Sequence, residues 1–329
     1  MKNVGIIGCG LVGQKRAKML KNARLLACAD IIREKAEELA KNYPDCIPTE
    51  NWQDVLDNPA IDIVIIATVH ASLAHIALAA IQAEKHILIE KPAAKKSSEL
   101  HEIIDAALKK NTLVRVGFNH RYHPAFQKAR ELIDSNALGE IMFIRARYGH
   151  GGRLGYEQEW RANPALSGGG ELLDQGIHLI DLARWFLGEF SEIDGYANTF
   201  FWNMPVDDNG FLLLKTPKKQ VAFLHASCTE WKNLFSFEIY GRTGKIDING
   251  LGGSYGVERL TFYKMLPAMG IPEVQQWEFP MEDNSWEVEF AEFLEDIERK
   301  RQPAAGLNDA HAALIIVEEI YRKTYDCGA

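Results

Sequence analysis

The chain has 329 residues and a net charge of −8 at pH 7, with apolar residues at 47% and charged residues at 25%. At roughly 150 residues per domain this length predicts about two domains, and the composition excludes a wholly disordered or collagen-like chain. Because acidic side chains outnumber basic ones, there is no general attraction to a polyanion. We therefore expect neither nucleic acid nor a membrane surface as a partner.

The cysteines favour a cytoplasmic protein. They lie far apart and form no C-x-x-C pair, and the odd count cannot pair fully within one chain: Cys9, Cys28, Cys46, Cys228 and Cys327. Reduced thiols are therefore expected. The first apolar run breaks into glycines too early for a signal-peptide core, and no window approaches the ~20 apolar residues of a membrane helix.

Residues 2–120 alternate short β-branched runs with helical patterns, which is typical of βαβ units around a parallel sheet. The run Ile63-Val64-Ile65-Ile66 is apolar at consecutive positions, so it must be covered on both faces. This half therefore predicts a doubly wound parallel sheet. Strands are expected at 4–7, 25–29, 61–67, 86–89 and 113–118, and helices at 11–20, 32–42, 72–84 and 97–110.

After residue 121 the pattern changes to longer alternating strands joined by tight turns, which predicts an α+β domain with a large, mostly antiparallel open sheet. The predicted domains are 1–121 and 122–329. Strands are expected at 141–148, 193–202, 210–215, 221–230, 235–240 and 260–265. Helices are expected at 124–135, 170–187 and 285–300, and a last helix begins with Asn308 as its cap.

A glycine motif follows the first strand and opens a helix: Gly8-Cys9-Gly10-Leu11-Val12-Gly13. Gly8 makes the tight turn, Gly10 with Leu11 and Val12 lets the backbone approach a pyrophosphate, and Gly13 allows close helix packing. The helix start offers N–H groups and a positive dipole end to phosphates. Residues 1–121 are therefore predicted to be a dinucleotide-binding Rossmann domain.

Asp30 at the end of the second strand indicates which dinucleotide is bound. Its carboxylate can accept hydrogen bonds from both ribose hydroxyls and repels a 2′-phosphate, so NAD is the predicted cofactor. NADP remains the alternative, because Arg33 is close enough in sequence to meet a 2′-phosphate.

Asp174, His178 and Asp181 have the spacing i, i+4, i+7, which places them on one face of the predicted helix 170–187. The neighbouring positions are apolar, so this polar stripe must face a partner or a cavity. Histidine suits proton transfer near neutral pH, and Asp174 can hold the imidazole in one tautomer. An ordinary acid and histidine pair on a helix surface is the alternative interpretation.

His120, His123 and His150 could be considered as metal ligands. No carboxylate or cysteine completes a recognised set, so no metal site is predicted. The segment 149–156 is either a substrate-facing loop or a plain connection between strands.

At Glu90-Lys91-Pro92 the chain resembles the Gfo/Idh/MocA oxidoreductases, whose dinucleotide domain carries an E-K-P tripeptide after its fifth strand. The resemblance extends over nearly the whole chain and includes the residues at 117–122, 159–161, 167–170 and 174–181. It implies NAD-dependent hydride transfer involving a secondary alcohol or ketone of a sugar, cyclitol or sugar derivative, with a nucleotide sugar as one subclass. It also implies a homodimer or homotetramer.

The resemblance implies catalytic roles for Lys91, Asp174 and His178, and a cis bond between Lys91 and Pro92. Besides the glycine motif and Asp30, the cofactor-binding residues are then Thr68, His70, His75, Glu90, Lys91, Asn119, Trp160 and Arg161. For Glu90 a structural anchor remains the alternative. Two other functions stay open: an NAD-dependent glycoside hydrolase and a non-catalytic dinucleotide-sensing protein.

Overall fold

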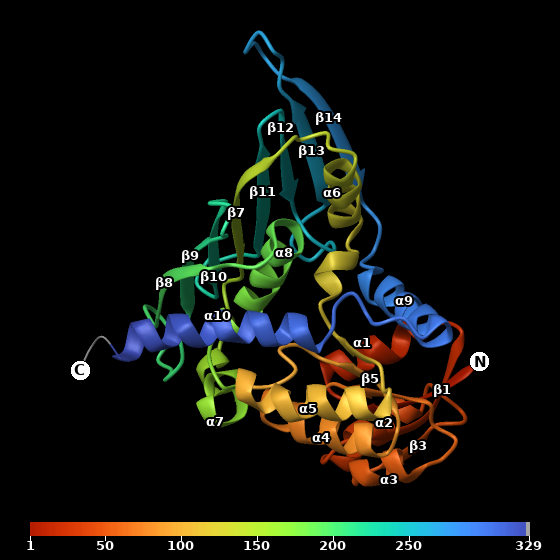
Figure 1. Ribbon diagram of the computed structural model, residues 1–329. Coiled ribbons are helices and arrows are strands. Elements are labelled where there is room, and N and C mark those ends of the chain that lie inside the picture. Colours follow the sequence, from red (N-terminus) through yellow and green to blue (C-terminus); the bar gives the residue numbers. More distant parts are fainter. Residues whose placement is uncertain (327–329) are drawn as a thin grey trace. The chain divides into compact units, whose positions relative to one another are not determined.

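The computed structural model describes residues 1–326 and divides into two compact units (Figure 1). Unit 1 comprises residues 1–118, 165–168 and 286–312, and unit 2 comprises residues 119–164, 169–285 and the described chain from 313 onward. The sequence predicted one division at residue 121, whereas both units are discontinuous. Unit 1 takes in residues 286–312, which the prediction placed in the second domain.

Unit 1 is built on six parallel strands in the order β3-β2-β1-β4-β5-β6, so the predicted doubly wound Rossmann sheet is confirmed. The strands are β1 (Lys2–Ile7), β2 (Ala23–Ala29), β3 (Ile47–Thr49), β4 (Ile63–Ile66), β5 (His86–Ile89) and β6 (Val114–Val116). The helices are α1 (Leu11–Lys18), α2 (Arg33–Ala40), α3 (Trp52–Asp57), α4 (His70–Gln82), α5 (Ser97–Lys110) and α9 (Ser285–Arg299). We did not predict β3 and α3 from the sequence, because elements this short show no hydrophobic periodicity.

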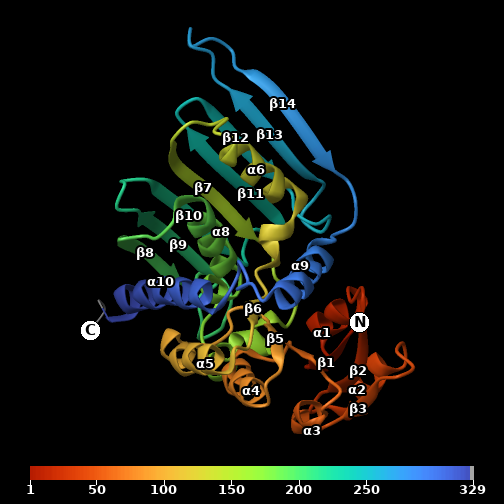
Figure 2. The same ribbon diagram turned by 45° about the vertical axis from the view of Figure 1, so that its right-hand side comes forward.

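One face of this sheet is covered by α1, α2 and α9, and Figure 2 shows α9 beside α1. Ile6 and Ile65 of the sheet belong to the same buried cluster as Phe290 and Phe293 of α9. Burying each such side chain contributes about 1.5–3 kcal/mol. A segment from near the end of the chain therefore completes the core that the first 118 residues begin.

Arg16 of α1 is buried between two carboxylates of unit 1. Its Nε donates to Glu90 Oε1 at 2.6 Å, its Nη1 contacts Glu289 of α9, and its guanidinium carbon lies 4.2 Å from the centre of the Trp286 ring. Burial alone would lower the pKa of Arg16, but Glu289 and Glu90 raise it above its ordinary value. Of the two roles left open for Glu90, these contacts show the structural anchor.

Replacing Arg16 by methionine would leave two buried carboxylates without the cation that they share. We expect the Arg16→Met variant to lose about 3–5 kcal/mol of unfolding free energy, measured by urea denaturation at pH 7. Arg33→Met is the control, because that side chain is exposed and pairs with Glu37 on the surface; its stability should stay nearly unchanged. Equal, small losses in both variants would contradict the anchoring role.

Unit 2 is built on eight strands in the order β14-β13-β12-β11-β7-β10-β9-β8. Only the pair β7 and β10 is parallel, so the predicted mostly antiparallel sheet is confirmed. The strands are β7 (Ile141–Gly149), β8 (Glu192–Asn198), β9 (Asn209–Lys215), β10 (Val221–Ser227), β11 (Leu234–Gly241), β12 (Gly244–Asn249), β13 (Glu258–Lys264) and β14 (Glu273–Phe279). The sequence missed β12 and also β14, which is exposed along most of its length and shows no apolar alternation.

The helices α6 (Pro124–Asp134) and α8 (Ile177–Leu187) pack on the same face of this sheet (Figures 1 and 2). The last helix, α10, spans Leu307–Asp326. The predicted cap was wrong: Asn308 lies inside α10, and it is the Asp309 carboxylate that accepts a hydrogen bond from the Gly306 N–H at 3.1 Å.

Two further expectations concerned free cysteine thiols and the lack of a membrane-spanning helix. Cys9, Cys28, Cys46 and Cys228 are buried free thiols, and Cys327 lies outside the described residues. Within residues 1–326, no helix combines the length and the apolar character needed to cross a bilayer.

Candidate functional site

The glycine turn of unit 1 has the geometry of a phosphate-binding turn. Gly8 has a φ of +96°, and its N–H donates to the Ala29 carbonyl at 2.8 Å. A Cβ on Gly13 would lie 1.9 Å from the Gly8 carbonyl oxygen, so α1 packs directly against the turn. Gly10 is the N-cap of α1 and no side chain caps this end of the helix, which leaves the N–H groups of the first turn for a phosphate.

Backbone hydrogen bonds fix the Asp30 carboxylate beside this turn. Oδ2 accepts from the Cys9 N–H at 2.8 Å, and Oδ1 accepts from the Ile32 N–H at 2.9 Å. Each carboxylate oxygen has a second acceptor position, so both can still accept a bond from a ribose hydroxyl. Arg33, which supported the NADP alternative, donates to Glu37 at 2.8 Å. The residues present therefore fit NAD.

Three predicted cofactor residues follow β4. Thr68 Oγ1 donates to the Val69 carbonyl at 3.2 Å, and His70 is buried at the start of α4. The Nδ1 atom of His70 lies 2.8 Å from the Ser167 carbonyl oxygen, so Nδ1 carries the proton. His75 lies further along α4, exposed, with its ring edge-on to Trp52 at 6.0 Å. Thr68 and His70 thus stay at the strand end, whereas His75 packs against α3.

Lys91 follows β5, which pairs in parallel with β4. The carboxyl ends of parallel strands meet at one edge of the sheet, where open α/β sheets bind their ligands. The Lys91-Pro92 peptide bond is cis, which confirms what the resemblance implied.

The helix predicted over 170–187 is not a regular α-helix. Residues Leu172–Gly176 form a π-turn that continues into α8, and such turns recur at functional sites. Asp174 lies in the π-turn and His178 in α8, and both are buried. Because a π-turn holds an extra residue, the i, i+4 rule does not apply across it, and the prediction of one strict α-helical stripe was wrong.

Asp207, which the sequence analysis missed, fixes the start of this segment. Its Oδ1 accepts from the Gly170 N–H at 3.0 Å and from the Tyr321 hydroxyl at 2.6 Å, and its Oδ2 accepts from the Leu172 N–H at 2.7 Å. Burial raises the pKa of Asp207 to about 6, although these hydrogen bonds favour the charged form. The only signal in the sequence is a polar run, Asp207-Asp208-Asn209, directly before an apolar strand.

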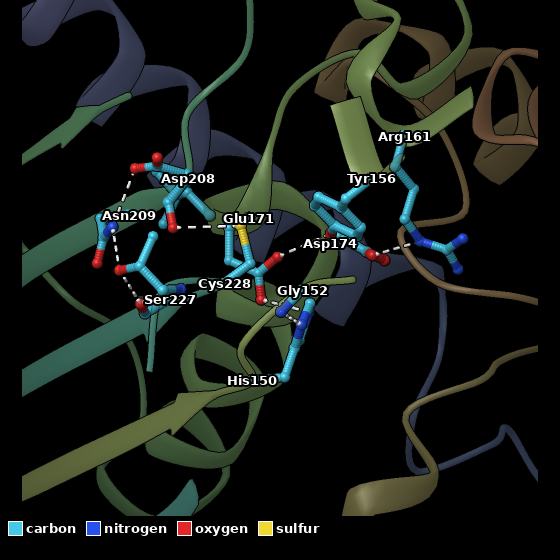
Figure 3. Close-up of polar contacts among 12 residues, drawn as sticks. His150, Gly152, Tyr156, Arg161, Glu171, Asp174, Asp208, Asn209, Ser227 and Cys228 are labelled. Carbon is cyan, nitrogen blue, oxygen red and sulfur yellow. Dashed lines mark hydrogen bonds and ion pairs between the residues drawn. The ribbon is translucent and has the colours of Figure 1, made fainter. Parts of the chain in front are cut away.

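Asp174 is bonded to the predicted cofactor residue Arg161: the Arg161 Nε donates to Asp174 Oδ2 at 2.9 Å (Figure 3). The Arg161 guanidinium in turn lies 4.7 Å from the centre of the Trp160 ring. The negative charge of Asp174 raises the pKa of Arg161 above its ordinary value. Within unit 2, Trp160 and Arg161 therefore position the candidate catalytic carboxylate.

The segment 149–156 brings a histidine to a second carboxylate in the same region (Figure 3). His150 Nδ1 accepts from the Gly152 N–H at 3.0 Å, so its proton is on Nε2, which lies 3.5 Å from Glu171 Oε1. Burial alone would lower the pKa of His150, but Glu171 raises it above its ordinary value. Glu171 is buried three residues before Asp174, so His150 connects the segment 149–156 to the segment that carries Asp174.

His120 stacks on His178, with ring centres 3.8 Å apart and planes inclined by 16°. Its Nδ1 lies 3.2 Å from Asn119 Oδ1, and Asn119 Nδ2 donates to Ser285 Oγ at 2.9 Å. Asn119, one of the predicted cofactor residues, therefore orients the ring that stacks on His178. His123 instead pairs with Glu258 at 2.9 Å, and residues 1–326 hold no cluster of three potential metal ligands.

Asp181 accepts a hydrogen bond from the Arg121 Nε at 2.8 Å and contacts the same guanidinium through its other oxygen. Both side chains are buried. Asp181 thus braces α8 against residues 119–122.

Two family models match the chain. The model of the Gfo/Idh/MocA oxidoreductase family with the NAD-binding Rossmann fold matches residues 2–118, and the Gfo/Idh/MocA C-terminal domain matches residues 126–247. The chain belongs to the Gfo/Idh/MocA oxidoreductase family. Residues 2–118 are therefore an NAD-binding Rossmann domain, as the glycine motif and Asp30 predicted.

Curated relatives include dehydrogenases of sugars and cyclitols. Levoglucosan dehydrogenase of Pseudarthrobacter phenanthrenivorans is 33% identical over 63% of this chain and 57% of that protein. Inositol 2-dehydrogenase 2 of Saccharopolyspora erythraea is 29% identical over 57% of this chain and 54% of that protein. Both alignments thus span little more than half of the relative. A solved structure of levoglucosan dehydrogenase in complex with NADH, 25% identical, has a TM-score of 0.86 and covers 98% of both chains.

The raised pKa of Asp207 can be tested by measuring how the unfolding free energy depends on pH. Because the pKa of about 6 lies above the ordinary 3.8, the folded protein holds this proton more tightly, and the contribution to stability falls as pH rises through that window. The unfolding free energy of the wild type minus that of Asp207→Asn should therefore be up to about 3 kcal/mol larger at pH 4 than at pH 7.

Urea denaturation at both pH values measures this difference. Asp57→Asn, at the exposed end of α3, controls for the loss of one surface carboxylate. A difference for Asp207→Asn that does not grow on acidification would contradict the raised pKa.

Proposed function

We propose that the protein is an NAD-dependent dehydrogenase or reductase that acts on a secondary alcohol or ketone of a sugar, cyclitol or sugar derivative. The observation that carries the proposal is the buried pair Asp174 and His178 on a segment held by Asp207, in a chain with an NAD-binding Rossmann domain. The levoglucosan and inositol dehydrogenases among its relatives support the substrate class.

In this proposal His178 takes the proton from the substrate hydroxyl, for which imidazole is suited near neutral pH. Asp174 stabilises the imidazolium that results, and Arg161 keeps the Asp174 carboxylate in place. Lys91 places positive charge beside the oxygen as it becomes negative. When NAD is bound, its nicotinamide accepts the hydride from the carbon.

Two alternative functions make different predictions. An NAD-dependent glycoside hydrolase would cleave glycosides without accumulating NADH. A dinucleotide-sensing protein would bind NAD without turnover, but the presence of Lys91, Asp174 and His178 together favours an enzyme. A nucleotide sugar is the subclass of substrate that the family resemblance suggested.

We further propose a cytoplasmic homodimer or homotetramer. The sheet face opposite α6 and α8 carries exposed apolar side chains, including Phe143, Leu213 and Phe223. Phe143 stacks on Tyr240 at 4.2 Å. Exposed apolar patches of this kind mark interfaces between chains, and reduced thiols are typical of the cytosol.

The central test is a dehydrogenase screen over free sugars, cyclitols, sugar acids and nucleotide sugars with NAD and NADP, followed at the NADH absorbance. His178→Ala should lower turnover of the best substrate by about two to four orders of magnitude, because the proton acceptor is lost. NAD affinity, measured by calorimetry, should change little. The exposed His101 gives the control, His101→Ala, with unchanged turnover. Equal losses in turnover and NAD affinity for His178→Ala would refute the assigned role.

Asp30 provides an independent test of the cofactor. Asp30→Ser should weaken NAD binding about tenfold or more, since hydrogen bonds to a charged group contribute about 1.5–3 kcal/mol. Asp30→Asn keeps an acceptor for the Cys9 N–H but removes the charge, so it should improve the use of NADP. The ratio of kcat/KM for NAD and NADP reports both effects. An unchanged ratio would assign cofactor choice to another residue.

A further inference from the structure

An aromatic cluster in unit 2 lies beside the segment that carries His150. Trp231 is 71% exposed and Phe201 55% exposed, and their rings meet edge to face at 4.9 Å. Phe201 also contacts Trp202 at 5.2 Å, and Trp202 contacts Tyr156 at 5.5 Å. Large rings that gather at a surface with their faces exposed usually mark a binding site.

The loop that carries Phe201 and Trp202 is held in one conformation. The buried Asp208 carboxylate accepts hydrogen bonds from the N–H groups of Phe200, Phe201 and Trp202 at 2.9, 2.7 and 3.0 Å. The Trp202 indole N–H donates to the Cys228 carbonyl at 2.9 Å. The backbone of this loop and the Trp202 ring are thus held before any ligand arrives, which lowers the entropic cost of binding.

Trp231 is presented by a constrained backbone. Its φ is +60°, which is an outlier for a bulky residue, and such outliers cluster at functional sites. The adjacent Glu230 N–H donates to the His150 carbonyl at 3.0 Å. A Cβ on Gly151 would lie 2.9 Å from the Trp231 carbonyl carbon, so the two backbones touch. The backbone of Trp231 therefore lies against the segment that carries His150, and His150 faces Glu171, three residues before Asp174.

The charges in the segments beside this aromatic cluster disfavour a phosphorylated or nucleotide ligand. Arg153 already donates to Glu159 at 2.6 Å, and Arg161 donates to Asp174 at 2.9 Å. Phosphate oxygens are usually met by arginine or lysine side chains. Carboxylates outnumber cations in the segments 150–164, 169–174 and 229–233: Glu157, Glu159, Glu171, Asp174 and Glu230 against Arg153, Arg161 and Lys232.

We propose that Phe201 and Trp231 form a subsite for a second, uncharged sugar ring, so that the substrate is a neutral glycoside or disaccharide of which one ring is oxidised. This inference rests on the proposed function, in which the sugar ring that is oxidised lies at His178. It adds the chemical class of the second group that is linked to that ring. The apolar faces of the second ring pack on the aromatic rings. Its hydroxyl groups lie near the carboxylates, which accept hydrogen bonds.

Maltose, cellobiose and lactose, compared with glucose, galactose and their methyl glycosides, test this subsite. For the wild type with NAD, at least one disaccharide should have a KM about tenfold below that of its monosaccharide, as expected if aromatic packing contributes about 1.4 kcal/mol. Trp231→Ala and Phe201→Ala should reduce this ratio to about one. Phe200→Ala, which removes a ring 62% exposed in the same loop that packs on Phe211 instead, should keep it.

Calorimetric titration of the wild type and the same variants with these saccharides, in the presence of NADH, measures binding without turnover. If no saccharide is oxidised but a disaccharide binds the wild type and not Trp231→Ala, the dehydrogenase proposal fails and the subsite stands. If monosaccharides are oxidised and disaccharides bind no better, the subsite is refuted. Light scattering after size exclusion covers the remaining outcome: a Trp231→Ala variant that dissociates into monomers with unchanged saccharide binding would make the cluster a subunit interface and overturn the proposal.

Discussion

The burial of Arg16 between Glu90 and Glu289 is the constraint on which the nucleotide-binding unit depends. A guanidinium with almost no access to water is tolerated only when carboxylates surround it. Here they come from the end of β5 and from α9. One group therefore fixes α1, which begins at the glycine turn, relative to the segment that carries Lys91, and it draws residues 286–299 into the core of unit 1.

In unit 2 a buried carboxylate has the corresponding role. Three glycines precede the segment of Asp174 and His178, and they give its backbone wide conformational freedom. Asp207 removes that freedom by accepting hydrogen bonds from the N–H groups of Gly170 and Leu172. The π-turn then begins at a defined residue. The stack of His120 on His178 and the buried ion pair of Asp181 hold the other end.

The side chains around Asp174 are positioned before a substrate binds. Arg161 pairs with Asp174, His150 faces Glu171, and the aromatic loop is fixed by Asp208. Such preorganisation is what electrostatic stabilisation of a developing charge requires. The same pairings engage the nearby arginines, which supports an uncharged carbohydrate as the ligand.

We could predict the parallel and antiparallel halves and the glycine turn from the sequence, because hydrophobic period and glycine spacing are local properties. The three candidate catalytic residues came from short motifs shared with the family. The ion pairs between distant residues became visible only in the folded chain. Glu90 meets Arg16 and Asp181 meets Arg121 across 74 and 60 residues of sequence. Which carboxylate reaches a given cation depends on how distant elements pack. The sequence could not show the π-turn for a related reason. An extra residue in a helical turn does not change the order of apolar and polar side chains along the chain. Its position depends on contacts with other parts of the folded chain.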